Sequence, residues 1–465
     1  MTQLVWFRND LRLADNAALS AACCAETPVR ACFTITPEQW LAHDWSPARV
    51  QLVMASASAL AGELARLGIP THFIHSRRFD DSLEQIEQLC LDQGISRVHF
   101  NEEYGVNERR RDRTLHQRLQ DLGIQVHKYR DQAIVPVGEI LTGKQQPYSV
   151  FTPFSRRWRA WIEEHPPRVL PLPGLRGTPL QPAAIGAIPE PFRSAMALPE
   201  PGENAAHRQL EQFLEQEVYR YREQRDFPAL EGTSQISPYL ACGTLSGRQC
   251  LVAAQQALVS GTNPDGVWTW INELAWRDFY IHVLYHNPRI SMHRAFKPET
   301  EALQWNPPGT AFAAWKSGHT GIPIVDAAMR QLNGTGWMHN RLRMITAMFL
   351  SKNLFIDWRL GEAWFMSKLV DGFLASNNGG WQWSASTGTD AAPYFRIFNP
   401  VTQSERFDPS GEFIRRWVPE LATLDNRRIH NPGKGGPLPA GYPPAIVDLK
   451  ASRKNAIARF QALKK

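Results

Sequence analysis

The sequence of 465 residues predicts two regions of different fold class: an N-terminal α/β domain with a doubly wound parallel sheet, and a mainly α-helical C-terminal domain. Three observations support this prediction. Short apolar runs alternate with helical patterns in the first 130 residues, a proline-rich stretch follows, and helical patterns fill most of the remainder. We place the domains at 1–135 and 204–465, with an interdomain connector at 136–203.

Five short runs rich in apolar residues are the candidate strands of the first domain. They lie at 4–7, 31–35, 71–74, 98–100 and 126–129. Nearly continuous apolar runs suit parallel strands that are buried on both faces. Three of the intervening helical patterns end at Gly68, Gly94 and Gly123, where glycine is favoured after the last turn. The alternation predicts right-handed crossovers, and because no glycine-rich phosphate loop occurs, we expect no nucleotide bound in that way.

The boundary between the two domains is predicted from proline. Residues 166–201 contain ten prolines, which exclude a helix, and no periodicity indicates a strand. The helices expected after this stretch lie at 204–224, 268–285, 324–332, 337–352, 361–370 and 448–465.

Composition limits the class of protein. No apolar stretch approaches the roughly 18–20 residues that span a bilayer, so we expect a soluble, cytoplasmic protein. The six cysteines show no C-x-x-C spacing, which argues against a disulfide framework or a metal site. A net charge of +6 weakly favours an anionic partner such as nucleic acid. Eleven of the sixteen tryptophans follow residue 260, which core packing alone does not obviously explain.

One expected helix carries polar and aromatic side chains on a single face. Glu273, Trp276, Arg277 and Tyr280 fall together at helical spacing. They form either an amphipathic helix with an internal Glu–Arg pair or the wall of a pocket for a flat heterocycle.

A second expected helix combines Trp337, Asn340 and Met344 on one face, with Arg343 beside them. A buried Arg343 requires an anionic partner, for which Asp371 is a candidate.

Three further patterns each allow two interpretations. Residues 377–383 read N-N-G-G-W-Q-W, which predicts a turn that either connects elements or places amides against a ring system. The hydroxyls of 233–237 suit a phosphate or a helix cap. Arg225, Arg341 and Arg396 suit DNA phosphates or surface ion pairs. No catalytic triad or carboxylate dyad is evident.

Together these segments resemble the photolyase/cryptochrome family of flavoproteins. The motifs are L-V-W-F-R-N-D-L-R from residue 4, E-L-A-W-R-D-F-Y from 273, T-G-W-M-H-N-R-L-R-M-I from 335 and N-N-G-G-W-Q-W-S-A-S-T-G-T-D from 377. The resemblance extends to about residue 420. Within the family, the sequence is most similar to class I cyclobutane pyrimidine dimer photolyases of the bacterial folate-antenna type.

The resemblance implies an α-helical domain that binds catalytic FAD. The matching contacts are Tyr221, Thr233, Ser234, Gln235, Ile236, Ser237, Trp276, Asn340, Arg343, Asp371, Gly372, Phe373 and Asn377. Light-excited reduced FAD would lend one electron to a flipped-out pyrimidine dimer, making the protein a carbon–carbon lyase that repairs DNA. The implied catalytic residues are Glu273, Asn340, Met344, Asn377, Trp276 and Trp383. The implied DNA contacts are Arg225, Glu273, Trp276, Arg277, Tyr280, Asn340, Arg341 and Arg396.

The resemblance also implies two accessory systems. Trp381, Trp358 and Trp305 match the family's electron-transfer chain. His43, Asn107 and Glu108 match contacts to a methenyltetrahydrofolate antenna. Two positions depart from the family: Met292 replaces a lysine that contacts the folate, and Phe373 replaces an aspartate near the flavin. We expect FAD to be retained, and we expect a monomer with neither metal nor membrane partner.

Three rival functions and one iron–sulfur variant compete with this interpretation. A cryptochrome-type blue-light receptor is the main alternative, although the chain lacks a long low-complexity extension. Repair of the six-four photoproduct is disfavoured because Asn340 and Met344 stand where histidines would be expected. A plain electron-transfer flavoprotein would show no preference for damaged DNA. An iron–sulfur variant is disfavoured because only Cys242 and Cys250 lie in the second domain.

Overall fold

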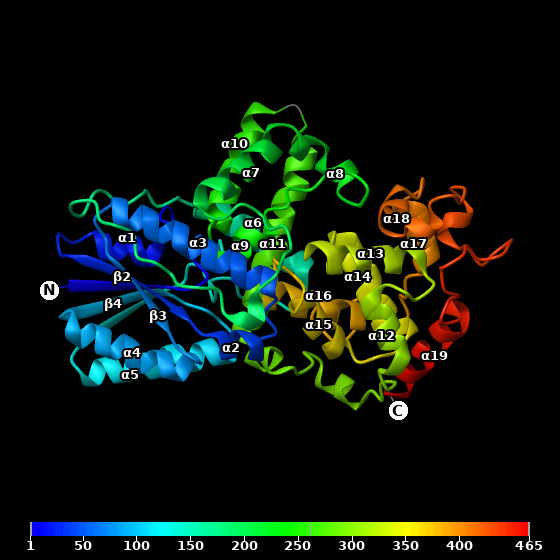
Figure 1. The fold of residues 1–465 in the computed structure, drawn as a ribbon, viewed down its shortest axis with the longest axis horizontal. Coiled ribbons are helices and arrows are strands. Elements are labelled where there is room, and N and C mark those ends of the chain that lie inside the picture. Colours follow the sequence, from blue (N-terminus) through cyan, green and yellow to red (C-terminus); the bar gives the residue numbers. More distant parts are fainter. Residues whose placement is uncertain (1, 262, 464–465) are drawn as a thin grey trace. The chain divides into compact units, whose positions relative to one another are not determined.

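The computed structural model describes residues 2–261 and 263–463 (Figure 1). No helix within these ranges is long and apolar enough to cross a membrane. The chain divides into two compact units, of which the first comprises residues 1–219, 234–288 and 370–373 and the second comprises 220–233, 289–369 and 374–465. The units are defined by contacts and the predicted domains by element type, so the domain limits stay predictions.

A parallel sheet of five strands forms the centre of the first unit, in the order β3-β2-β1-β4-β5. The strands are β1 (Thr2–Phe7), β2 (Val29–Ile35), β3 (Thr71–His75), β4 (Ile95–Asn101) and β5 (Gln125–Tyr129). All five expected strands are confirmed. From β1 the chain adds β2 and β3 on one side of the sheet and then β4 and β5 on the other side of β1. The carboxyl ends of the parallel strands β1 and β4 therefore define a topological switch point.

Helices cover both faces of this sheet, which confirms the doubly wound architecture (Figure 1). Alternate side chains of β1 enter two different cores: Val5 and Phe7 join one, Leu4 and Trp6 the other. The first core includes α1 (Ala17–Cys23) and α3 (Pro47–Arg66), and the second includes α4 (Phe79–Asp92) and α5 (Val106–Asp121). A short α2 (Pro37–Ala42) follows β2.

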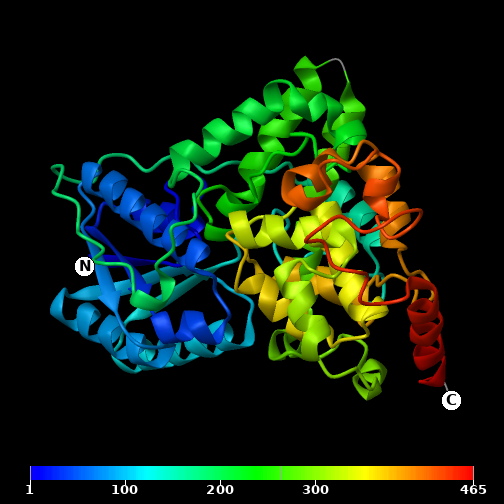
Figure 2. The same ribbon diagram turned by 45° about the vertical axis from the view of Figure 1, so that its right-hand side comes forward.

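The proline-rich stretch runs along the sheet region, as the green-blue trace in Figure 2 shows. Between α6 (Phe151–Glu164) and α7 (Glu203–Glu215) it contains only a 3-10 turn at Glu190–Phe192. The Leu180 N–H donates to the Ala65 carbonyl at 2.9 Å, and Phe192 is buried in the core of the α3 face. The stretch is therefore fixed to the surface by its own contacts.

The remaining helices of the first unit are α9 (Ser237–Cys242), α10 (Gly247–Ser260) and α11 (Pro264–His286). The helix expected at 204–224 is wrong as a single element. It is divided into α7, a 3-10 turn at Glu217–Arg220, and α8 (Tyr221–Gln224). Gln216 has φ −139° and ψ −54°, outside the helical region, and this residue ends α7.

The regular elements of the second unit are helices, joined by turns and irregular loops in its described residues. Its elements are α8, α12 (Gly309–Ser317), α13 (Pro323–Thr335), α14 (Asn340–Met348), α15 (Trp358–Met366), α16 (Leu374–Ala385), α17 (Pro400–Phe407), α18 (Glu412–Trp417) and α19 (Leu449–Ala462), with 3-10 turns at Pro288–Met292, Pro298–Ala302, Pro419–Leu421 and Arg428–His430. A large core containing Trp315, Trp358 and Trp381 holds most of them together.

Two expected elements of this unit need correction. The helix expected from 337 begins at Asn340, because the His339 side chain accepts a hydrogen bond from the Arg341 N–H at 3.1 Å and caps the helix there. It continues into a π-helical turn at Phe349–Asn353. Residues 377–380, expected to form a turn, lie inside α16.

The C-terminal helix α19 confirms the helix expected at 448–465, whose last two residues lie outside the described ranges. Its Phe460 ring covers Lys352, whose Nζ lies 3.7 Å from the ring centroid. The same Nζ donates to Ser386 Oγ at 2.8 Å. Burial lowers the pKa of Lys352 well below its usual range.

Candidate functional site

The polar and aromatic face predicted around residue 276 lies on α11. The Trp276 ring stacks on Phe151 of α6, with centroids 3.5 Å apart and planes 7° apart. Tyr280, one turn further along α11, lies 5.7 Å from Trp276. Both rings are half-buried, and Glu273 is half-buried one turn before Trp276. The arrangement forms a rigid aromatic wall next to a carboxylate, which favours the pocket interpretation.

Arg277, also predicted on this face, makes two contacts with the protein backbone. Its guanidinium donates to the carbonyls of Gln132 at 2.8 Å and Leu240 at 3.4 Å. The Phe373 ring lies 5.2 Å from it, so an aromatic face stands where the family has a carboxylate. Because of burial, the pKa of Arg277 lies below its usual range. These contacts suit a positioning role, and the predicted DNA contact of Arg277 stays a prediction.

A buried carboxylate fixes α11 to the segment that follows β5. Asp278 accepts hydrogen bonds from the Ile134 and Val135 N–H groups at 3.1 and 3.0 Å and from Trp158 Nε1 at 2.9 Å. Burial raises the pKa of Asp278, although these hydrogen bonds favour the charged form. His282 Nε2 lies 3.0 Å from the Val135 carbonyl. The helix that carries Glu273 and Trp276 therefore has a fixed position in the first unit.

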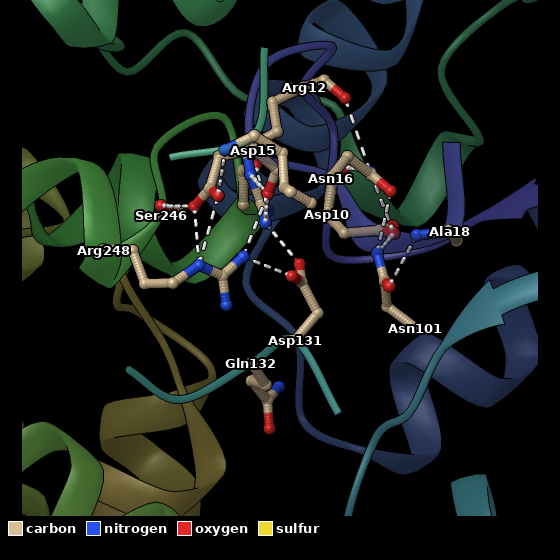
Figure 3. Close-up of polar contacts among 12 residues, drawn as sticks. Asp10, Arg12, Asp15, Asn16, Ala18, Asn101, Asp131, Gln132, Ser246 and Arg248 are labelled. Atoms are coloured by element: carbon tan, nitrogen blue, oxygen red, sulfur yellow. Dashed lines mark hydrogen bonds and ion pairs between the residues drawn. The ribbon is translucent and has the colours of Figure 1, made fainter. Parts of the chain in front are cut away.

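An ion network lies next to this segment (Figure 3). Asp131 forms ion pairs with Arg12 and Arg248, and Arg248 also pairs with Asp15 at 3.0 Å. Ser246 Oγ donates to Asp15 at 2.5 Å. Burial alone would raise the pKa of Asp131, but the two guanidiniums outweigh it and hold the pKa below its usual range. The network anchors the loop after β1 and the residue that precedes Gln132.

The hydroxyl-rich segment predicted to bind FAD is held by its neighbours in the first unit. Ser237 Oγ donates to Asp371 at 2.6 Å, and Trp270 Nε1 donates to Ser234 Oγ at 3.3 Å. Gln235 has φ 50°, a left-handed backbone conformation that residues other than glycine rarely adopt. Ile236 is buried, and Gly372 and Phe373 follow Asp371 in the same unit.

Two of the predicted phosphate contacts are brought together in the second unit. Arg341 donates to Asp226 at 2.7 Å, and Arg225 lies 3.8 Å from the same carboxylate. The Arg225 guanidinium also lies 5.5 Å from the centroid of Tyr221, a predicted FAD contact. Arg396, the third predicted phosphate contact, is exposed. Two guanidiniums that share one carboxylate keep a net positive charge on this surface.

The predicted pocket residues of α14 lie at its exposed start. Asn340 is exposed as the first residue of the helix, and Met344 is half-buried one turn on. Arg343 Nε donates to the Met338 carbonyl at 2.8 Å. The predicted pair of Arg343, in the second unit, with Asp371, in the first, stays a prediction. His339 is buried beside them, and burial lowers its pKa to about 4.

The paired asparagines of α16 both bind Glu362 of α15. Asn377 Nδ2 donates to the Glu362 carbonyl at 3.1 Å, and Asn378 Nδ2 donates to Glu362 Oε1 at 2.9 Å. Gln382 donates to Asn378 Oδ1 at 2.8 Å. These bonds satisfy polar side chains inside a helix, which explains why the sequence N-N-G-G does not form a turn here. Trp383, one residue on, lies 6.4 Å from Phe398.

The three tryptophans of the predicted electron-transfer chain share one core. Trp358 and Trp381 are fully buried, and the half-buried Trp305 packs against the same cluster. The indole N–H groups of Trp358 and Trp381 have no hydrogen-bond partner among the described residues. Gly361 leaves the space for Trp381, since a Cβ at this position would lie 2.1 Å from the indole ring.

The three predicted antenna contacts lie together in the first unit. His43 Nε2 lies 2.9 Å from Asn107 Nδ2, and His43 Nδ1 lies 3.4 Å from Glu108 Oε1. Glu108 also borders a pocket whose lining includes Phe79 and Trp45. Met292, the departure noted above, belongs to the second unit and is 55% exposed.

Three residues with clear roles were missed by the sequence analysis: Phe151 under Trp276, Asp226 between two arginines, and Glu362 beneath the asparagines. Only Asp226 carried a signal, because it directly follows Arg225 in the sequence. The other two contacts join distant segments and leave no periodic pattern. Within residues 2–261 and 263–463, no group of three His, Cys, Asp or Glu side chains could hold a metal ion.

Comparison with known proteins supports the same assignment along the whole chain. A protein-family model described as DNA photolyase matches residues 3–173. A second family model, described as the FAD binding domain of DNA photolyase, matches residues 270–462. The deoxyribodipyrimidine photo-lyases of Salmonella typhimurium and Escherichia coli are each 46% identical to the chain. Each match covers 100% of this chain and 99% of the relative.

Solved structures agree in fold. A class III photolyase from Agrobacterium tumefaciens matches with a TM-score of 0.88 and 34% identity, covering 100% of this chain and 98% of that one. A cryptochrome from Synechocystis matches with a TM-score of 0.87 and 29% identity, with 98% of both chains covered. The chain therefore belongs to the DNA photolyase family. Its fold, a parallel α/β domain followed by a helical FAD-binding domain, is the photolyase fold and confirms the predicted class.

Proposed function

We propose that the chain is a deoxyribodipyrimidine photo-lyase that uses light to split cyclobutane pyrimidine dimers in DNA. The observation that carries the proposal is the wall on α11, where Trp276 is stacked on Phe151 next to Glu273. Enzymes that act on a base take it out of the stack and hold it between aromatic surfaces and hydrogen-bonding groups. Full-length identity of 46% to two photo-lyases supports the same activity.

The residues present fit FAD by the chemistry of their side chains. The hydroxyls at 233–237 suit a diphosphate, and Ser237 orients the Asp371 carboxylate at 2.6 Å. Arg343 is the proposed partner of that carboxylate. Bound FAD would supply the redox chemistry, lending one electron to the dimer on excitation and recovering it after the ring opens. The protein residues bind and orient both molecules.

Asn377 presents a hydrogen-bond acceptor to the proposed flavin site. Its Nδ2 is used by the Glu362 carbonyl at 3.1 Å, so Oδ1 is the atom it can offer. By the family resemblance this side chain faces the flavin N5. An acceptor at that position favours the protonated form of N5 and therefore helps to keep the flavin reduced.

The residues proposed to hold the dimer are those that the family resemblance implies. Glu273 hydrogen-bonds the flipped bases, Trp276 and Trp383 stack against them, and Asn340 and Met344 contact them. The rings also exclude water, which would otherwise surround the charged dimer. Flanking phosphates are bound by Arg225, Arg341 and Arg396, with Tyr280 at the edge of the site. We further propose a cytoplasmic monomer, in agreement with six free cysteines.

We propose two accessory roles. Trp381, Trp358 and Trp305 conduct electrons from the surface to the flavin. Because Trp358 and Trp381 have no partner for their N–H groups among the described residues, an oxidised ring there has no acceptor for its proton. His43, Asn107 and Glu108 bind a methenyltetrahydrofolate antenna. Met292 lacks the ammonium that would attract the anionic tail of folate, so we expect weaker folate binding than with lysine.

The test is repair of ultraviolet-irradiated oligothymidylate by the FAD-loaded, reduced protein under light, measured as recovery of pyrimidine absorbance. Glu273→Ala should slow repair while flavin stays bound, and Glu84→Gln, which changes an exposed carboxylate of α4, should change neither. Loss of flavin from Glu273→Ala would show that Glu273 is structural. Bound flavin without any repair by the unmodified protein would favour the cryptochrome-type receptor.

A further inference from the structure

An exposed tryptophan stands at the beginning of α11. Trp268 is 43% exposed, and the Arg159 guanidinium of α6 lies 5.4 Å from its ring centroid. Arg159 also lies 3.5 Å from Asn272 Oδ1, one turn along α11. A guanidinium over an indole face is favourable and keeps both groups in place. The pair is therefore oriented, although both side chains remain in contact with solvent.

This pair continues the aromatic wall described above. Helices α6 and α11 run antiparallel: Phe151 stacks on Trp276, and Arg159, eight residues later in α6, covers Trp268, eight residues earlier in α11. Eight helical residues correspond to about 12 Å along the axis. Trp268, Asn272 and Trp276 lie four residues apart, so each neighbours the next on the helix surface. One continuous surface thus joins the proposed dimer site to the exposed pair.

The charges on α6 indicate how far this surface extends. Arg156 and Arg159 are exposed, whereas Arg157 is paired with Glu164 at 3.1 Å. The exposed carboxylates of Glu163 and Asp265 lie one turn beyond Arg159 and Trp268. A polyanion is attracted as far as the guanidiniums of Arg156 and Arg159 and is repelled beyond them.

We propose that Trp268 and Arg159 extend the DNA-binding surface and contact the sugar–phosphate backbone that flanks the flipped dimer. The inference rests on the proposed function. About 12 Å corresponds to roughly three to four nucleotides of duplex rise, so the contact lies outside the dimer site itself. Arg159 binds a phosphate, and the indole packs against the adjoining sugar or base. Indoles and guanidiniums are the side chains that single-stranded and distorted DNA binds best.

The experiment compares two dimer-containing DNAs: a duplex of two helical turns and a pentathymidylate whose internal dimer leaves only one or two nucleotides on either side, too few to reach Trp268. The double variant Trp268→Ala, Arg159→Ala should lower affinity for the duplex by about tenfold and lower the salt dependence by about one phosphate. Its affinity for the pentathymidylate should fall less than about twofold. Arg157→Ala is the matched control on the same helix and should bind both DNAs as the unmodified protein does.

Three results would overturn the inference. Unchanged affinity for the duplex would remove Trp268 and Arg159 from the DNA surface. Equal loss on both DNAs would assign them to the fold or to the dimer pocket. A shift in sedimentation without a change in DNA affinity would assign the face to an interface between copies of this chain. If the unmodified protein does not distinguish damaged from undamaged DNA, the proposed function fails, and this inference fails with it.

Discussion

Two regions of the molecule, the ion network around Asp131 and the indole core around Trp381, handle their buried polar groups in opposite ways. In the network around Asp131, the Arg12 guanidinium and two carboxylates are buried beside the half-buried Arg248, and each charge has an opposite partner. In the indole core around Trp381, the rings are just as buried, yet two indole N–H groups have no partner among the described residues. Ion pairs fix the positions of the side chains in the network, whereas close packing of the rings fixes those in the indole core.

This difference shows what each region is built to do. A paired buried charge holds the backbone in one arrangement, because any movement would leave a charge unpaired. The network therefore fixes loops that the apolar core alone would not. A buried indole N–H without an acceptor costs about 1–3 kcal/mol. Under the proposed electron-transfer role, such an N–H would keep its proton when the ring is oxidised.

The largest expected effect comes from breaking the ion network. Asp131→Ala leaves Arg12 and Arg248 buried without that carboxylate and should lower the free energy of unfolding by about 3–5 kcal/mol. Denaturant unfolding measures it, with exposed Asp92→Ala as a near-neutral control. Because the folded pKa of Asp131 is lowered, its stabilisation in the unmodified protein is present above its ordinary pKa of 3.8 and is lost as pH falls below that value. A loss as small as that of Asp92→Ala would show that the network is not structural.

A second effect concerns a buried group that has no strong ion pair. His339 has a folded pKa of about 4, against an ordinary value of 6.5. The unfolded chain therefore binds a proton that the folded chain does not, and stability should fall by up to about 3 kcal/mol between pH 6.5 and 4. His339→Asn keeps an oxygen acceptor to cap α14 and removes this acid sensitivity. The free energy of unfolding, measured at pH 6.5 and at pH 4 for both proteins, tests this prediction. The same pH dependence in His339→Asn as in the unmodified protein would contradict it.

The shape of the indole core can be tested at Gly361. An added Cβ would lie 2.1 Å from the rigid Trp381 ring, so Gly361→Ala should destabilise the protein by about 1–3 kcal/mol. The same substitution at Gly62 of α3, where a Cβ meets nothing within 4 Å, should instead stabilise it by about 0.5–1 kcal/mol. Thermal unfolding distinguishes the two. Equal effects at both positions would show that the fit around Trp381 is loose.

The smallest expected change in stability is that of Trp381→Phe, which we compare with the same substitution at the neighbouring Trp315. Trp381→Phe leaves no hydrogen-bond partner behind and should cost less than about 1.5 kcal/mol, but it should largely abolish photoreduction of oxidised FAD. Trp315, 6.0 Å away, donates to the Thr346 carbonyl at 3.2 Å. Trp315→Phe should therefore be more destabilising yet keep photoreduction. Photoreduction that survives Trp381→Phe would remove this ring from the chain.

Sequence reasoning located the sheet because its signals are local. Each strand is a short apolar run, and helix ends such as Gly68 have a positive φ that glycine accepts readily. It failed at residues 377–380, where two asparagines and two glycines favour a turn. The helix forms there because Asn378 finds a buried carboxylate on α15, a contact that no local pattern encodes.

The sequence also predicted some parts of the candidate site and not others. His43 is separated by 64 residues from Asn107, which directly precedes Glu108, and the fold brings the three side chains together. Spacing on α11 correctly put Trp276 and Tyr280 on neighbouring turns. It could not reveal that Phe151 supports Trp276, because that pairing depends on how α6 packs against α11.

The ring of Phe460 over Lys352 gives the end of the chain a chemical signature. A lowered pKa increases the fraction of the neutral, nucleophilic amine, and the Phe460 ring contributes to covering the Lys352 side chain. Acylating reagents should modify it at the rate at which α19 detaches, and mass spectrometry of that one lysine would report the local opening of the C-terminal helix. The same measurement would show whether an affinity tag fused after the last residue makes α19 detach more often.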